Sequence, residues 1–227
     1  MRRLLPFALS LTLVAVASLC SAEVPAAGAA GGCSRPRPTI NLSRELRRPV
    51  LDNTLPRPAL QGILHGAEGT TTEGLYTGRL NGALTTKIGI QGTAGDVCVR
   101  VDRIDVQITI APRTIYIARG RRPGSCGYNV VLEHERKHEA VDDDVVIAHL
   151  PIIRQALETA ATTAGTLVVP AYRQQEAVDG LTKAVSDAFE RAFAQLTAEQ
   201  ARRQAAVDTP QEYARVSAAC GARRRSP

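Results

Sequence analysis

Hydrophobic and polar residues alternate with a period of two over residues 97–110, which predicts a β-strand. The apolar positions change face once within this stretch, so we expect a bulge or turn near Asp102. The Ala-Pro-Arg sequence at 111–113 predicts a turn, and the sequence TIYIARG at 114–120 predicts the second strand of a hairpin. With weaker strand signals upstream, these patterns predict an antiparallel β-rich region over residues 38–120.

The hydrophobic spacing changes to the 3.6-residue period of an α-helix after the glycine-rich loop at 120–127. Apolar residues and two histidines then recur on one face over residues 130–148, and Ser125 or Asn129 is suited to cap the start of this helix. We expect the helix to continue past Pro151 with a kink, or to restart there.

A second long helix is predicted over roughly residues 174–207, where apolar residues again follow helical spacing. A short helix then restarts near Asp208, with Asp208 or Thr209 as its cap and Pro210 in its first turn. The predicted fold class is therefore α+β, with an antiparallel β-rich N-terminal half followed by a helical half. We expect residues 38–220 to form a single domain.

The ends of the chain carry sequence signals of their own. Residues 1–22 have the order of a secretory signal peptide, with two arginines, an apolar run and small residues before a cleavage site. A lipid anchor at Cys20 is the alternative, and the apolar run is short for a membrane span. Residues 23–37 predict a flexible leader, and residues 221–227 a basic tail. These signals predict an exported protein, periplasmic or secreted, without a membrane-spanning segment.

Four cysteines follow the predicted signal peptide, at positions 33, 98, 126 and 220. An even number in an exported protein predicts two disulfide bonds, for which three connectivities are possible. We favour pairing Cys98 with Cys126 and Cys33 with Cys220, and the alternative is that some of them stay free. The absence of a C-x-x-C spacing argues against a zinc site made of cysteines.

Composition and charge exclude one broad class of function. The chain has 227 residues, a formal net charge of +6, no tryptophan and 4% aromatic residues. A modest positive charge and few aromatic side chains argue against nucleic-acid binding, which uses basic surfaces and stacking platforms. We therefore expect no nucleic-acid partner.

The sequence H-E-x-x-H, formed by His134, Glu135 and His138, contains two of the four histidines in the chain. Residues four apart lie on the same face of a helix, so the two imidazoles can converge on one Zn²⁺ ion with bonds of about 2 Å. Glu135 is turned about 100° from His134, where it can act as the general base toward water in an open coordination position. The pattern therefore predicts a zinc site with a catalytic carboxylate beside it.

An alternative is that the two histidines are buried core residues that are hydrogen-bonded without a metal. The charged residues of this helix occupy the opposite face, whereas both histidines share the apolar stripe with valines. That position fits a ligand and a satisfied core histidine alike.

A third protein ligand is needed, and helix geometry restricts where it comes from. Asp142 lies about 12 Å from His134 along the helix axis, and His149 lies about 16 Å from His138, so neither reaches a shared centre. The ligand should come from the last long helix or its end. The candidates there are Glu190, Glu199, Asp208 and Glu212.

The sequence GSCGYNVVLEHERKHEAVDDDV, followed downstream by QAAVDTPQEY, resembles a family of exported bacterial proteins of unknown function that is grouped with the zincin-type metallopeptidases. The resemblance covers roughly residues 95–220. It implies a zincin-like helical half carrying H-E-x-x-H, a bound Zn²⁺ ion, and Asp208 as the third ligand with Glu212 as the next choice. A helix cap is the alternative role of Asp208.

The motif and the resemblance together predict a zinc-dependent hydrolase that cleaves a peptide or protein substrate in the cell envelope. His134, His138 and Asp208 would hold the metal, and Glu135 would be catalytic. Charged residues at 136 and 137 depart from the family's pattern, because peptidases of this type generally carry uncharged residues there. The alternative is a non-catalytic, disulfide-stabilised envelope or binding protein with a structural or vestigial metal site. Tyr213 is a candidate for stabilising an oxyanion or for packing the terminal helix.

Overall fold

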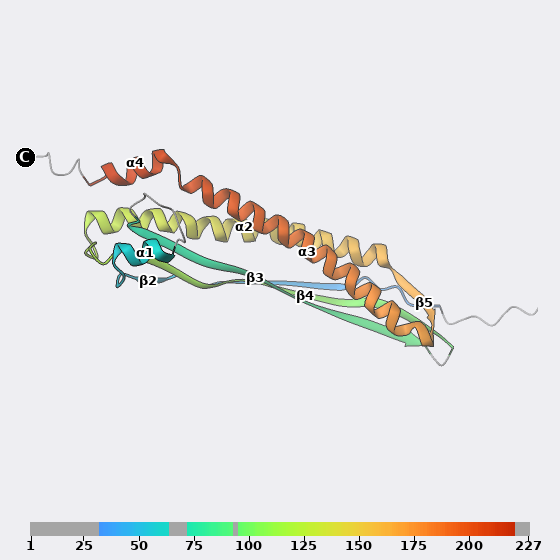
Figure 1. Ribbon diagram of the computed structural model, residues 1–227. Coiled ribbons are helices and arrows are strands. Elements are labelled where there is room, and N and C mark those ends of the chain that lie inside the picture. The colour runs from blue at the N-terminus through green and yellow to red at the C-terminus, as the bar shows by residue number, and fades with distance from the viewer. Residues whose placement is uncertain (1–31, 64–71, 93–94, 221–227) are drawn as a thin grey trace, which may run out of the picture. The chain divides into compact units, whose positions relative to one another are not determined.

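A computed structural model describes residues 32–63, 72–92 and 95–220 of the chain (Figure 1). The predicted signal peptide, most of the predicted leader and the predicted basic tail lie outside the described residues. From Cys33 onward the chain forms one compact unit.

The strands are organised around β4 (Asp96–Ile117), with which each of the other described strands pairs. β1 (Thr39–Leu46) and β2 (Val50–Asp52) run parallel to β4, whereas β3 (Gly74–Gly92) and β5 (Thr166–Pro170) run antiparallel to it. The prediction of an antiparallel β-rich N-terminal half is therefore wrong. The alternation along one strand reports which face is buried, but it does not report the direction of the neighbouring strand.

The predicted turn at residues 111–113 is also wrong, because β4 continues through it. Pro112, which has no N–H to donate, lies where the register with β3 shifts between Gly78 and Leu80, and where pairing with β1 has ended and pairing with β2 has not begun. The predicted bulge near Asp102 is confirmed, because the pairing skips this residue. At each of these two breaks the buried positions of β4 shift in phase.

The helices agree with the sequence predictions. α2 (Cys126–Ala164) begins after Ser125, whose side chain accepts a hydrogen bond from the backbone N–H of Tyr128, and it continues through Pro151. α3 (Gln174–Val207) has the predicted bounds. α4 (Pro210–Ala218) is capped by Thr209, whose hydroxyl accepts from the backbone N–H of Glu212. The remaining helical segments among the described residues are α1 (Arg57–Ile63) and the 3₁₀ turn η1 (Ala171–Arg173).

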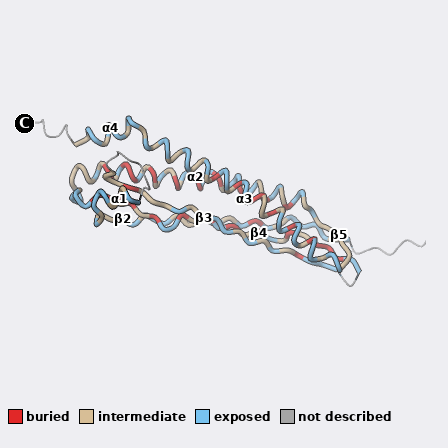
Figure 2. The backbone as a smooth tube through the Cα atoms, viewed as in Figure 1, coloured by how far each residue is buried: buried red, intermediate tan, exposed pale blue. Residues whose placement is uncertain are grey.

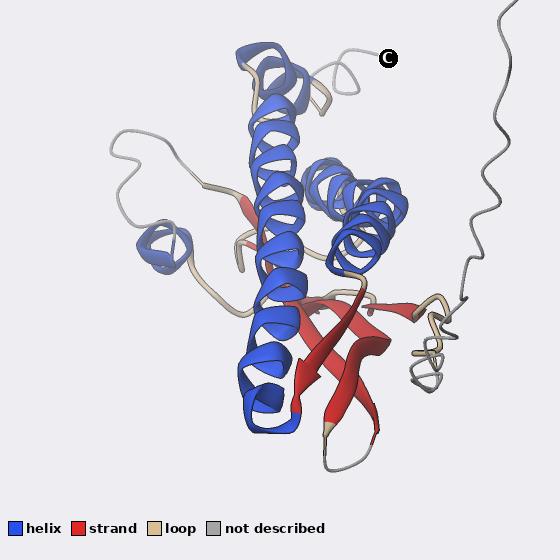
Figure 3. Cartoon of the chain, turned by 90° about the vertical axis from the view of Figure 1, so that its right-hand side faces the viewer, coloured by secondary structure: helices blue, strands red, loops and turns tan. Residues whose placement is uncertain are grey.

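The hydrophobic core lies between the sheet and the two long helices, which share one side of it (Figures 1 and 3). Figure 2 shows that buried positions in the strands and in both helices face this layer. β4 contributes alternate residues, and α2 and α3 contribute the stripes that the helical period predicts. The largest fully buried side chains include Ile104, Ile108, Ile110, Ile153, Leu157, Leu181 and Leu196.

Two disulfide bonds link Cys33 with Cys98 and Cys126 with Cys220. The predicted number is confirmed and the favoured pairing is wrong. Parallel pairing explains the first bond, because the alignment of Thr39 with Arg103 carries residue 33 back to the start of β4. Disulfides persist in oxidising compartments. No helix among the described residues is long and apolar enough to cross a membrane.

Candidate metal centre

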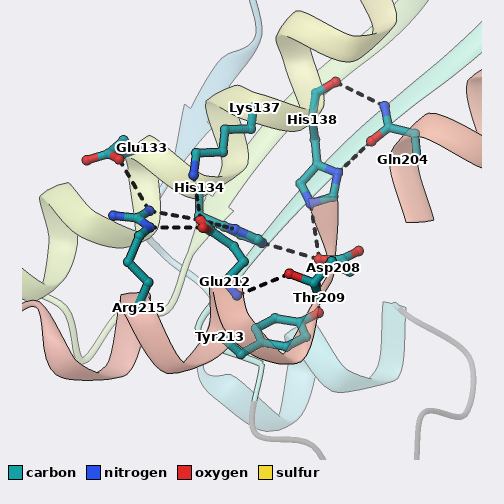
Figure 4. Close-up of polar contacts among 10 residues, drawn as sticks. All are labelled: Glu133, His134, Lys137, His138, Gln204, Asp208, Thr209, Glu212, Tyr213 and Arg215. Atoms are coloured by element: carbon teal, nitrogen blue, oxygen red, sulfur yellow. Dashed lines mark hydrogen bonds and ion pairs between the residues drawn. The ribbon is translucent and has the colours of Figure 1, made fainter. Parts of the chain in front are cut away.

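The two histidines of α2 and the aspartate between α3 and α4 meet at one point (Figure 4). The Nε2 atoms of His134 and His138 each lie 3.3 Å from the same atom, Oδ1 of Asp208. One ligand atom from each residue lies within 4.8 Å of the other two, so the group could hold a metal ion. Both histidines are buried, whereas Asp208 is on the exposed side.

The other nitrogen of each imidazole faces an oxygen acceptor. His134 Nδ1 lies 3.3 Å from a carboxylate oxygen of Glu212, and His138 Nδ1 lies 2.5 Å from the amide oxygen of Gln204. Because these oxygens accept hydrogen bonds, each Nδ1 carries the proton and each Nε2 can present its lone pair to a metal. The ring nitrogens thus have the arrangement that a metal ligand requires.

In the metal-free centre, the neighbouring groups favour the protonated, cationic form of both histidines. Hydrogen bonding to Asp208 raises the pKa of His134 above its usual value. Burial acts to lower the pKa of His138, but the hydrogen bonds that its ring donates to Asp208 and Gln204 outweigh this effect, so the pKa is raised. Burial acts to raise the pKa of Asp208, but the hydrogen bonds from both histidines hold it well below its usual range.

These shifts predict opposite pH dependences with and without metal. The raised histidine pKa values stabilise the metal-free protein below about pH 6.5, and this contribution is lost as the pH rises through the folded-state values. Metal binding needs neutral imidazoles, so its contribution grows with pH. We expect the Tm in EDTA to fall between about pH 5.5 and about pH 8.5, and the Tm in excess zinc to rise. Thermal unfolding in both buffers measures this, and parallel curves would contradict it.

Glu135 is only 4% exposed and lies beneath β3. Burial raises the pKa of its carboxyl to about 7, and the backbone N–H of Tyr76 and the charges of both histidines act in the opposite direction. Gly74 permits the close approach of the strand, because a Cβ atom there would lie 2.5 Å from a carboxylate oxygen of Glu135. The glutamate therefore shares the electrostatic environment of the histidines without contributing to the three-residue group.

Glu212 supports His134 from outside the three-residue group. Its carboxylate accepts hydrogen bonds from Arg215 Nε at 2.9 Å and from Lys137 Nζ at 2.7 Å, and these bonds hold the pKa of Glu212 well below its usual range. Arg136 points into solvent. The two charged residues within the motif are thereby accommodated, because one is exposed and the other holds the carboxylate that orients His134.

Tyr213 is the remaining predicted residue that the structure brings to the centre. Its hydroxyl donates to Asp208 Oδ1 at 2.9 Å, and its side chain is 50% exposed. Partial burial and the neighbouring carboxylate raise the pKa of Tyr213 to about 12. The phenol is therefore protonated near neutral pH and able to donate a hydrogen bond.

Two of the candidate third ligands lie away from the centre. Glu190 is exposed on α3, and Glu199 is bound to the guanidinium groups of Arg202 and Arg203.

Sequence reasoning missed Gln204, although a signal existed. The apolar stripe of α3 ends at Leu196, and glutamines occupy the next positions at the helical spacing of four.

Comparisons of the chain with protein-family models, with curated proteins and with solved structures found no match. The resemblance to the zincin-type family therefore stays a prediction.

Proposed function

We propose that this protein is a zinc-dependent hydrolase of the cell envelope, and specifically a metallopeptidase. The single observation that carries the proposal is the convergence of three donor atoms from His134, His138 and Asp208 beside a buried glutamate. A set of two imidazoles and one carboxylate, with room for a further ligand, is typical of catalytic zinc sites. The disulfides support an oxidising location, such as the periplasm or the cell exterior.

The residues around the centre divide the work of peptide hydrolysis. A bound zinc ion would supply Lewis acidity toward a carbonyl group and would acidify water. Glu135 then accepts the proton of the attacking water and passes it to the leaving amine. A nearby dication favours the ionised carboxylate that this role needs, opposing the effect of burial. Tyr213, half-exposed beside the centre, donates its one hydroxyl proton to Asp208 Oδ1. Release of that bond on metal binding would let the hydroxyl donate toward the developing oxyanion.

A second candidate is a non-catalytic envelope or binding protein with a structural metal. The burial of Glu135 favours it. The carboxylate accepts a hydrogen bond from the backbone N–H of Tyr76 in β3, and this bond also connects the strand to α2. In that case metal binds and no peptide is cleaved.

Metal content and peptide cleavage, measured on the same preparation, test the proposal. We expect about one zinc ion per purified chain and cleavage of a mixed peptide library that stops with chelator and returns with zinc. Mass spectrometry of the library identifies the cleaved bonds. Zinc without cleavage would support the second candidate, and a chain that binds no zinc would exclude both.

A further inference from the structure

Asp142 is a buried carboxylate that the proposed reaction does not use. It lies one helical turn after His138 and is 1% exposed. Its Oδ1 accepts from the side-chain amides of Gln200 and Gln204 at 2.7 Å each, and its Oδ2 accepts from the hydroxyl of Tyr76 at 2.6 Å. A buried charge is tolerated when it is hydrogen-bonded in this way, and the bonds join α2 to α3 and β3.

Gln204 stands between this carboxylate and the metal centre. Its Nε2 donates to Asp142 and to the backbone oxygen of His138 at 3.0 Å, while its Oε1 lies 2.5 Å from His138 Nδ1. Both amide protons have acceptors, so a flipped amide would leave two acceptors facing an oxygen. The amide orientation is therefore fixed, and with it the tautomer of His138 that leaves Nε2 open to a metal.

We propose that Gln204, held by Asp142, is a positioning residue for His138. The inference rests on the proposed function, because it names what aims one of the metal ligands. The carboxylate polarises the amide, and the amide oxygen holds the imidazole through Nδ1. Tyr76 completes the arrangement, since its ring lies parallel to that of His138 at 6.4 Å and its hydroxyl is bound by Asp142 and by Arg113.

The two imidazoles are therefore oriented by different chemistry. His134 is held directly by the carboxylate of Glu212 in α4. His138 is held by a neutral amide, with the carboxylate of Asp142 one hydrogen bond further away. The amide keeps the proton on Nδ1 of His138 without bringing a carboxylate into direct contact with Nδ1. The negative charge of Asp142 is therefore not placed directly on this ligand.

Gln200 supplies a matched control, because it donates to Asp142 but does not contact His138. We expect Gln204→Met to weaken zinc binding by about 10–100-fold, the usual effect of removing a partner of a metal-bound histidine. Gln200→Met should change the zinc affinity by less than about 3-fold. It should lower the Tm of the zinc-free protein about as much as Gln204→Met does, because each variant removes one hydrogen bond to Asp142. Competition with a chromophoric chelator measures the affinity, and the visible spectrum of bound Co²⁺ reports the geometry.

If Gln204→Met and Gln200→Met weaken zinc binding equally, the hydrogen bonds around Asp142 serve only to connect α2 with α3, and the inference is overturned. Unchanged zinc affinity in Gln204→Met overturns this inference alone, whereas an original chain without zinc overturns the proposed function with it.

Discussion

Replacing Glu135 with glutamine is expected to lower kcat/KM for peptide cleavage by about 10²–10⁴-fold, the usual contribution of a general base. Glutamine has nearly the same shape and keeps an oxygen for the backbone N–H of Tyr76, but it cannot accept the proton of the attacking water. The three donor atoms of the metal group come from other residues, so zinc content should stay at about one ion per chain. Cleavage kinetics and elemental analysis of the same sample measure both.

Glu139→Gln is the control for the Glu135 variant, because it makes the same chemical change four residues later on α2, at a half-buried position outside the metal group. We expect its kcat/KM to stay near that of the original chain. If Glu135→Gln cleaves peptides at the original rate with zinc bound, the glutamate is a structural residue beneath β3. The proposed hydrolase would then have no residue assigned as the general base.

The inner part of the candidate site could be predicted from the sequence because it is local. The spacing of His134 and His138 fixes their relation through helix geometry alone. The long-range part needed other information, since Asp208 lies 70 residues or more along the chain. The resemblance to the zincin-type family predicts Asp208 as a ligand, and the structure places it within reach of both histidines.

The residues that hydrogen-bond behind the histidines are not predicted by the sequence pattern. They are polar residues at positions where the pattern predicts apolar ones. Helix geometry excludes Asp142 as a ligand because of its distance from His134, and its side chain connects to the His138 ring through Gln204 on another helix. The sequence predicts a turn at Arg113, whereas this residue occupies a core-facing position of β4 and donates a hydrogen bond to Tyr76. The first contact depends on how α3 packs against α2, and the second depends on the register between β3 and β4.

The fold was predicted where local periodicity decides it and was missed where pairing does. The bounds of α3 and the bulge at Asp102 follow from the spacing of apolar residues. The parallel pairing of β1 and β2 with β4 leaves no mark in that spacing. The disulfide error has the same origin, because only the parallel register brings Cys33 to Cys98.

The segment that completes the metal group depends on the Cys126–Cys220 disulfide. Leu196 is the last buried residue of α3, and residues 197–220 contain none. These residues are held by polar contacts to α2, by partial packing of Val216, and by the disulfide that ties the end of α4 to the start of α2. The bond thus fastens together the two segments that carry the metal-binding side chains.

Replacing both cysteines of this bond with serine is expected to weaken zinc binding by roughly 100-fold. The segment that carries Asp208 and Glu212 would separate more readily from α2, leaving the ion with two imidazoles for much of the time. The magnitude follows from structural zinc sites, where about 10–16 kcal/mol spread over four ligands gives roughly 3 kcal/mol for one of them. Chelator competition under non-reducing conditions measures the affinity.

The Cys33–Cys98 bond is the matched control for this variant. It closes a loop with a sequence separation of 65, against 94 for the bond near the metal group, and loop-closure entropy makes the two bonds similar in stability to within about 0.5 kcal/mol. It lies at the start of β4, away from the residues that contact the histidines. The Cys33→Ser/Cys98→Ser chain should therefore unfold at a lower temperature and bind zinc with nearly unchanged affinity. Equal losses of zinc affinity in the two variants would mean that general stability, rather than the attachment of α4, maintains the metal group.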